Sequence, residues 1–180
     1  MKSKLRVLLF LIFLSLPVAA HTGGKIKVTC PVCSTKFETQ VTMSSTRMGA
    51  LRDFEARGAV GSMYEDGVAS CTACHYSWET DDFEKPVTPN LKKWVLSDIK
   101  PKYAKGEIDK VEAYKTYARI AAHKLPKDLE QATIYRLASY VARHENKPEA
   151  ERRQLQAEVA THLISALEKK EVSAQEVVFN

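Results

Sequence analysis

The chain contains four cysteines, and all of them fall into two Cys-x-x-Cys pairs, Cys30 with Cys33 and Cys71 with Cys74. Each pair can turn two thiolates toward one point, so two pairs can supply the four ligands of a tetrahedral ion. This spacing predicts a zinc site whose ligands are Cys30, Cys33, Cys71 and Cys74. A chain that forms such a site must bring two segments that are distant in sequence into contact.

The second pair is also compatible with a different cofactor. His75 follows Cys74 directly, and Cys-x-x-Cys-His is the spacing of covalent c-type haem attachment. In this alternative the Cys71 and Cys74 thiols add to the haem vinyl groups and His75 is the proximal ligand. A haem would leave the first pair without a role, whereas a four-sulfur zinc site uses every cysteine, so zinc is the first interpretation.

Residues 1–20 have the pattern of a secretory signal peptide. Lys2, Lys4 and Arg6 precede an apolar stretch of about ten residues, and small residues follow at Val18 and Ala20. The apolar stretch is too short to span a bilayer, which requires about twenty residues. We expect cleavage before His21, export to the periplasm or the medium, and no stable membrane span after cleavage.

Removal of the predicted signal peptide would lower the net positive charge of the chain. The formal charge of +5 includes the three positive side chains of the signal, and the remainder has 24 basic against 22 acidic side chains. No run of lysine and arginine interleaved with aromatic residues occurs after residue 20. The composition therefore argues against nucleic acid as a partner.

Export also keeps a thiol–disulfide alternative open. Outside the cytoplasm thiols tend to form disulfides, and four-cysteine zinc sites are less common there. A bridge within one Cys-x-x-Cys pair closes so short a loop that it constrains little of the unfolded chain. Such a bridge would therefore serve redox chemistry, which requires a lowered thiol pKa. Neither pair clearly begins a long helix, so this alternative ranks last.

The residues around both pairs alternate between polar and apolar. Residues 25–29 and 36–41 have this pattern on the two sides of the first pair, which predicts a hairpin with residues 30–33 at its turn. Residues 76–80 continue the pattern after the second pair. Two hairpin turns that carry thiolates, each followed by an aromatic residue (Phe37 and Trp78), are the features of a zinc ribbon. The metal or a bridge then replaces the core that so small a sheet lacks.

The rest of the chain divides into an excursion and a helical region. Residues 43–70 are rich in arginine, glycine, serine and acidic side chains, and we expect them to be irregular and partly helical. From about residue 107, apolar residues recur at helical spacing in three stretches. Short links between the stretches favour antiparallel packing. The three apolar stripes are Ile108, Val111, Tyr114, Ala118 and Ala121; Ile134, Leu137, Ala138 and Val141; and Leu155, Val159, Leu163 and Leu167.

The predicted fold class is α+β, a small zinc-ribbon-like β module followed by an antiparallel α-helical tail. We predict three segments: a signal peptide at 1–20, a cysteine module at 21–100 and a helical region at 101–175. Composition changes near residue 100, because all four cysteines precede it and alanine-rich charged stretches follow it.

Several short motifs occur together along the chain: Cys30–Cys33 with Phe37 and Glu38, Arg52-Asp53-Phe54, Tyr64, Cys71–Cys74 with Tyr76, Asp82-Phe83, and Tyr135–Tyr140. In this combination the chain resembles a known bacterial family, the domain of unknown function 2225. The resemblance covers roughly residues 25–168, and it implies a two-part cysteine ribbon with a tetratricopeptide-like helical tail. Ribbon turns usually have glycine after the second cysteine, whereas this chain has Ser34 and His75 there.

These features lead to three functional hypotheses. The first is a non-enzymatic module in which a zinc ribbon carries a helical surface that binds another protein, as concave helical-repeat surfaces commonly do. The second is an electron-transfer protein with one c-type haem, and the third is a thiol–disulfide oxidoreductase. The sequence has no phosphate-binding glycine-rich loop, no His-Glu-x-x-His and no Gly-x-Ser-x-Gly motif, so we assign no catalytic residue.

Overall fold

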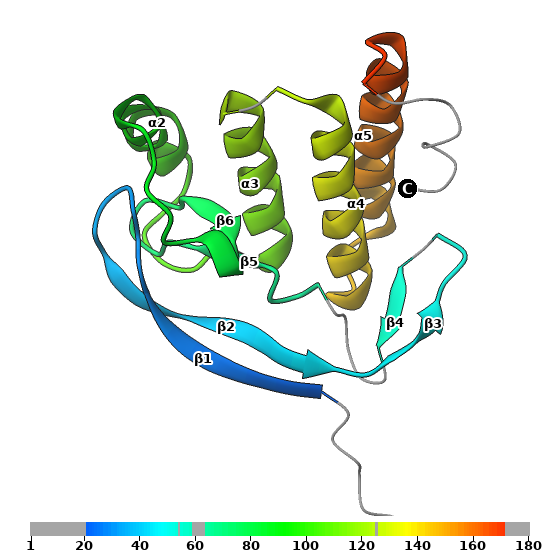
Figure 1. Ribbon diagram of the computed structural model, residues 1–180, viewed down its shortest axis with the longest axis horizontal. Helices are drawn as coiled ribbons and strands as arrows, with labels where there is room; N and C mark the ends of the chain where they lie inside the picture. Colours follow the sequence, from blue (N-terminus) through cyan, green and yellow to red (C-terminus); the bar gives the residue numbers. More distant parts are fainter. Residues whose placement is uncertain (1–20, 54, 59–63, 125, 172–180) are drawn as a thin grey trace, which may run out of the picture.

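The computed structural model of the protein describes residues 21–53, 55–58, 64–124 and 126–171. The predicted signal peptide at 1–20 lies outside the described residues, as do the last positions of the predicted helical region. The described part has a β-hairpin region followed by packed helices, which confirms the α+β class (Figure 1). None of the described helices has the length and apolar character that crossing a membrane would require.

The first hairpin is formed by the two longest strands, β1 (His21–Thr29) and β2 (Lys36–Ser45). They pair antiparallel, with Thr29 opposite Lys36 and Val28 opposite Phe37, so the first cysteine pair lies at the turn. Inward-facing Phe37 and Thr39 alternate with exposed Glu38 and Gln40 along β2. The alternating sequence therefore predicted this hairpin and its turn correctly.

Two shorter hairpins follow, β3 (Arg47–Ala50) with β4 (Ala56–Gly58) and β5 (Val68–Ser70) with β6 (Ser77–Glu79). The second cysteine pair lies at the turn between β5 and β6. The expectation of a partly helical excursion was wrong for the described residues of 43–70, which form strands and turns. Tertiary contacts position β3 and β4: the Tyr140 hydroxyl donates to the Asp53 carbonyl at 2.6 Å.

Ion pairs with the C-terminal end of α4 (Asp128–His144) hold the β3–β4 hairpin in place. The Glu55 side chain is buried and pairs with Arg143 at 2.8 Å and with His144 at 2.8 Å. Arg143 also pairs with Asp53. Burial raises the pKa of the Asp53 carboxyl group, but the guanidinium of Arg143 outweighs this effect and holds the pKa below its usual value.

A short helix, α2 (Pro89–Trp94), begins the helical part beside the cysteines. The Thr88 side chain accepts a hydrogen bond from the Leu91 backbone N–H at 3.3 Å, and Pro89 stands at the first helical position, so both residues favour a helix start. A π-helical turn at Val95–Ile99 and a 3-10 turn at Lys100–Lys102 continue it.

Three long helices then pack as antiparallel neighbours, α3 (Lys110–Lys124), α4 (Asp128–His144) and α5 (Glu149–Glu168). The first two predicted stripes are buried at most of their positions, although Ile108 precedes α3 and is half-buried. In the third stripe only Leu155 is fully buried, because α5 packs on one side against α4 and leaves Ile164 exposed.

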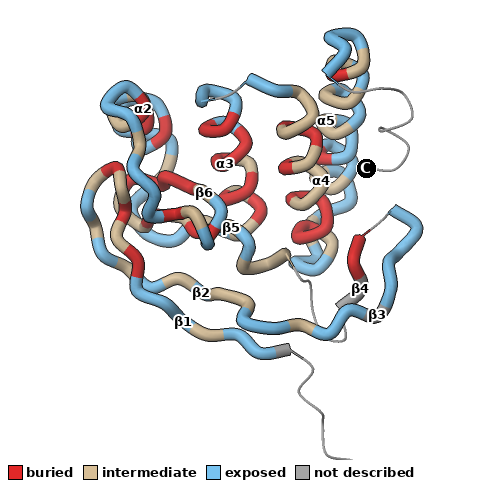
Figure 2. The backbone as a smooth tube through the Cα atoms, in the orientation of Figure 1, coloured by how far each residue is buried: buried red, intermediate tan, exposed pale blue. Residues whose placement is uncertain are grey.

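Two clusters of buried side chains meet at Trp78 on β6. One surrounds the cysteines and includes Phe83, Val95 and Ile99, and it also contains Ile120 from α3. The other lies among α3, α4 and α5, as the buried segments in Figure 2 show. Trp78 packs against both clusters and meets Tyr117 edge-on, with their ring centroids 4.9 Å apart. The division of the chain at residue 100 stays a prediction.

Asp128 connects the start of α4 to the end of α5. Its carboxylate accepts hydrogen bonds from His162 at 2.8 Å, Ser165 at 2.7 Å and Lys169 at 2.5 Å. Lys169, followed by His162 and Ser165, lowers the pKa of the Asp128 carboxyl group well below its usual value. The contact therefore stabilises the antiparallel pair when Asp128 is ionised.

We predict that Trp78→Ala lowers the free energy of unfolding by about 3 kcal/mol, the usual cost of removing a large side chain that packs in a core. The reason is that Trp78 fills the junction of the two clusters. Denaturant titration measures the change, and Ile164→Ala is the matched control because Ile164 is 58% exposed. Equal effects of the two substitutions would contradict the claim that Trp78 fills the junction of the two clusters.

We predict that Asp128→Asn lowers the melting temperature at pH 7 and lowers it clearly less at pH 3. The folded-state pKa of Asp128 is lowered, so its stabilisation is complete above the unfolded pKa of about 4 and declines progressively as the pH falls from there through the lower folded value. Thermal unfolding at both pH values tests this, with exposed Asp81→Asn as control. A loss that is independent of pH would show that shape, rather than charge, matters at this position.

Candidate metal centre

The two cysteine turns have the same backbone hydrogen bonds. In the first, Ser34 N–H donates to the Cys30 carbonyl at 2.9 Å and Cys30 N–H donates to the Thr35 carbonyl at 2.9 Å. In the second, His75 N–H donates to the Cys71 carbonyl at 2.8 Å and Cys71 N–H donates to the Tyr76 carbonyl at 2.9 Å. We call these turns the first knuckle (residues 30–35) and the second knuckle (residues 71–76).

Each knuckle closes through a residue in the left-handed region of backbone space. Ser34 has φ of 61° and His75 has φ of 58°. These are the positions where ribbon turns usually have glycine, so the sequence departs from the usual residue while the backbone keeps the usual conformation. A residue with a Cβ is strained there. The strain is retained because the turn directs both thiols of a pair to the same side.

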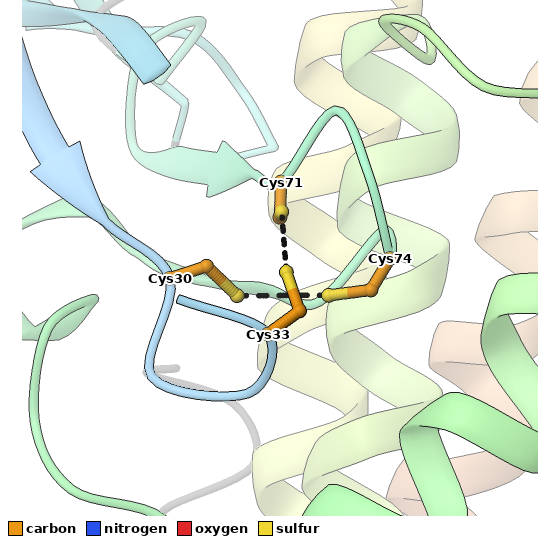
Figure 3. Close-up of side chains that lie close together, drawn as sticks. All are labelled: Cys30, Cys33, Cys71 and Cys74. Carbon is orange, nitrogen blue, oxygen red and sulfur yellow. Dashed lines mark hydrogen bonds between the residues drawn. The ribbon is translucent and has the colours of Figure 1, made fainter. Parts of the chain in front are cut away.

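The four sulfur atoms converge between the knuckles, all within 4.8 Å of one another (Figure 3). Two separations that join the knuckles are 3.6 Å each: Cys30 Sγ to Cys74 Sγ, and Cys33 Sγ to Cys71 Sγ. A tetrahedral zinc ion with Zn–S distances of about 2.3 Å requires sulfur atoms about 3.8 Å apart. These two separations are therefore close to the edge of a zinc–sulfur tetrahedron.

The cluster is shielded from solvent. Cys30, Cys71 and Cys74 are at most 1% exposed, and Cys33 is half-buried. The Ala73 backbone N–H donates to Cys71 Sγ at 3.5 Å, and the Cys33 thiol donates to the Thr35 hydroxyl at 3.2 Å. The Ala73 N–H points at the Cys71 sulfur and so stabilises a thiolate there, as the groups around a metal ligand commonly do.

The sulfur atoms also change one another's acidity. Interaction with Cys30, and then with Cys74, lowers the pKa of Cys71 to about 2. Interaction with Cys71 and burial raise the pKa of Cys30 to about 12. Interaction with Cys30 and Cys71, together with burial, raises the pKa of Cys74 as well. The cluster thus accommodates one negative charge readily and resists further ones. A divalent cation would relieve that repulsion, so the donor set fits zinc.

His75, the proximal ligand of the haem alternative, packs against Tyr103. It is 1% exposed, and the centroids of the two rings lie 5.1 Å apart. Burial lowers the pKa of its imidazole. Tyr103 in turn bonds to Thr116 at 2.9 Å and accepts from Arg119 at 2.9 Å, so His75 connects the second knuckle to α3.

The sequence reasoning missed the side chains that cover the cluster from α2 and the π-helical turn. Leu91, Val95 and Ile99 are buried in the same core as the cysteines. Their spacing of four residues and the Thr88-Pro89 start were signals of a helix. Glu84 was also missed: it accepts a hydrogen bond from the Thr29 backbone N–H at 2.6 Å and holds the end of β1.

Comparison with known proteins gave one match. Residues 25–177 match the family described as "Uncharacterized protein conserved in bacteria (DUF2225)", which agrees with the resemblance seen in the motifs. No curated protein and no solved structure matches the chain.

We predict opposite effects when glycine replaces the two left-handed residues. Ser34 is exposed, so Ser34→Gly relieves backbone strain and stabilises the protein by roughly 0.5–1 kcal/mol. His75→Gly relieves the same strain but also removes a buried ring, so we expect a net loss of roughly 1–3 kcal/mol. Thermal unfolding of both variants measures the difference. Stabilisation by both would mean that the contact with Tyr103 contributes little.

Proposed function

We propose that this chain, which belongs to the bacterial DUF2225 family, is an exported, non-enzymatic module that binds another protein and is held together by zinc. The observation that carries the proposal is the convergence of all four cysteine sulfurs within 4.8 Å. Zinc bound by four buried thiolates has no open coordination position, so its role is to stabilise the fold. Cys30, Cys33, Cys71 and Cys74 would hold the ion.

The architecture explains why a metal is useful here. The two hairpins that carry the cysteines are separate two-stranded sheets, and such hairpins are marginal on their own. A metal that joins the knuckles fixes both hairpins against the helices through Trp78 and Ile120. The exposed faces of this rigid assembly are then available to a protein partner.

Export is part of the proposal because of residues 1–20. Their positive start, their apolar stretch and their small residues before His21 support cleavage by signal peptidase. A periplasmic or secreted location follows from such cleavage. Zinc that is bound to buried thiolates would protect them from the disulfide formation that this location favours.

The geometry favours zinc over the haem alternative. Haem attachment would employ Cys71 and Cys74 with His75, yet these two sulfurs lie beside Cys33 and Cys30. His75 is buried and packs against Tyr103.

The geometry also disfavours thiol–disulfide exchange at one Cys-x-x-Cys pair. Exchange needs an accessible thiolate, and Cys71, whose pKa is lowest, is fully buried.

The proposal is tested on the protein that cells export from the full-length gene. We expect an amino terminus at His21, close to one zinc per chain and no haem absorption. Cys74→Ser should lose the zinc and lower the melting temperature by about 10 °C or more, while exposed Ser44→Ala keeps both.

Three results would contradict it. A covalently attached haem band would support the electron-transfer alternative. Neither metal nor free thiols would indicate disulfides, and an uncleaved chain in the cytoplasm would disprove export.

A further inference from the structure

All the described sheets have two strands, so β2 and β5 each have one edge that no other described strand covers. β2 pairs with β1 alone, and β5 pairs with β6 alone. An uncovered edge presents unpaired N–H and C=O groups, which readily accept another strand. Because each of these hairpins has a cysteine knuckle at its turn, the position of each edge depends on the sulfur cluster.

Residues of both strands line one groove. The groove, of about 620 Å³, is lined by residues 37–40 of β2, by Val68 and Ser70 of β5, and by Ile108 and Ala113 near the start of α3. Lys25 is its only lining residue from β1, and no residue of β6 lines it. The groove therefore lies beside β2 and β5, the strands whose partners β1 and β6 contribute little to its lining.

The groove is acidic although the chain as a whole has more basic than acidic side chains. Its lining includes four carboxylates (Glu38, Glu65, Asp66 and Glu107) and two ammonium groups (Lys25 and Lys110). Lys110 pairs with Glu65 at 3.3 Å and with Asp66 at 3.5 Å. Glu38 and Glu107 form no ion pair with any residue in the described part of the chain, so their charges remain available to a ligand.

We propose that this groove binds an extended peptide segment of a partner protein, and that the segment carries lysine or arginine. The peptide would add as a strand to the uncovered edge of β2, and its main-chain groups would pair with residues 37–40. Residues 37–40 offer about 13 Å of edge at about 3.3 Å per residue, so roughly four residues of the peptide would pair. Basic side chains would meet Glu38 and Glu107.

This inference rests on the proposed function, because it names the partner-binding surface of the zinc-stabilised module. Thr72 of the second knuckle lines the groove, and so does Phe37, the second residue of β2, just after the first knuckle. Loss of the metal would let the two edges separate. Metal content is therefore measured in every sample. Loss of peptide binding with zinc retained can then be distinguished from loss of binding that follows loss of zinc.

The test uses the exported protein and a fluorescent peptide of about seven residues that alternates lysine with threonine. We expect saturable binding that weakens as salt rises from about 0.05 M to about 0.3 M, because screening reduces charge attraction. A peptide with glutamate in place of lysine should bind at least about tenfold more weakly. Amide shifts in nuclear magnetic resonance spectra should map to residues 37–40 and 68–70.

The matched variants separate charge in the groove from net charge. Glu38→Lys with Glu107→Lys should reduce the affinity for the lysine peptide about tenfold or more, with zinc content unchanged. Glu145→Lys with Glu168→Lys changes the net charge equally at exposed positions outside the groove, and it should leave the affinity within about twofold.

Equal binding of both peptides, or amide shifts elsewhere on the protein, would overturn the proposal. So would concentration-dependent shifts of residues 37–40 in the protein alone, because a second copy of the chain would then occupy the edges. Binding by a variant that has lost its zinc would show that the groove does not need the metal, and would remove the link to the proposed function while keeping the peptide site.

Discussion

The convergence of two cysteine knuckles is the constraint on which the hairpin half of this structure depends. β1–β2 and β5–β6 are separate sheets, and neither has enough strands to be stable alone. What joins them is a cluster of four sulfur atoms and the apolar side chains packed around it. The left-handed conformations of Ser34 and His75 belong to the same constraint, because they close the turns that direct the sulfurs inward.

Local sequence patterns predicted the helices and the hairpin whose formation depends mainly on residues close together in the sequence. Alternation specified the β1–β2 hairpin, and three apolar stripes specified α3, α4 and α5. The Cys-x-x-Cys spacing sufficed to bring four sulfurs together, since each pair acts as one unit. The β3–β4 hairpin could not be predicted this way, because buried Glu55 finds Arg143 and His144 almost ninety positions away. No local signal reports a charge pair at that separation.

The sulfur cluster and the long helices are physically continuous. Ile120 of α3 belongs to the core of the cysteines, and Trp78 packs on both cores. His75 reaches α3 through Tyr103, and Tyr117 of α3 donates to Glu79 of β6 at 2.9 Å. These contacts make the site a part of the same packed interior as the helices, so a change at the sulfurs alters the support of both halves.

The separation of the two knuckles along the chain also bears on the order in which the protein folds. α3 contacts α4 and α4 contacts α5, each the next helix in sequence, whereas the sulfur cluster must join knuckles whose first cysteines are Cys30 and Cys71. Local contacts form faster than distant ones because less chain entropy is lost before they stabilise the structure. We therefore expect the helices to form first and to offer α3 as the template on which the hairpins assemble. Metal would then be captured late, by a chain that is already half folded.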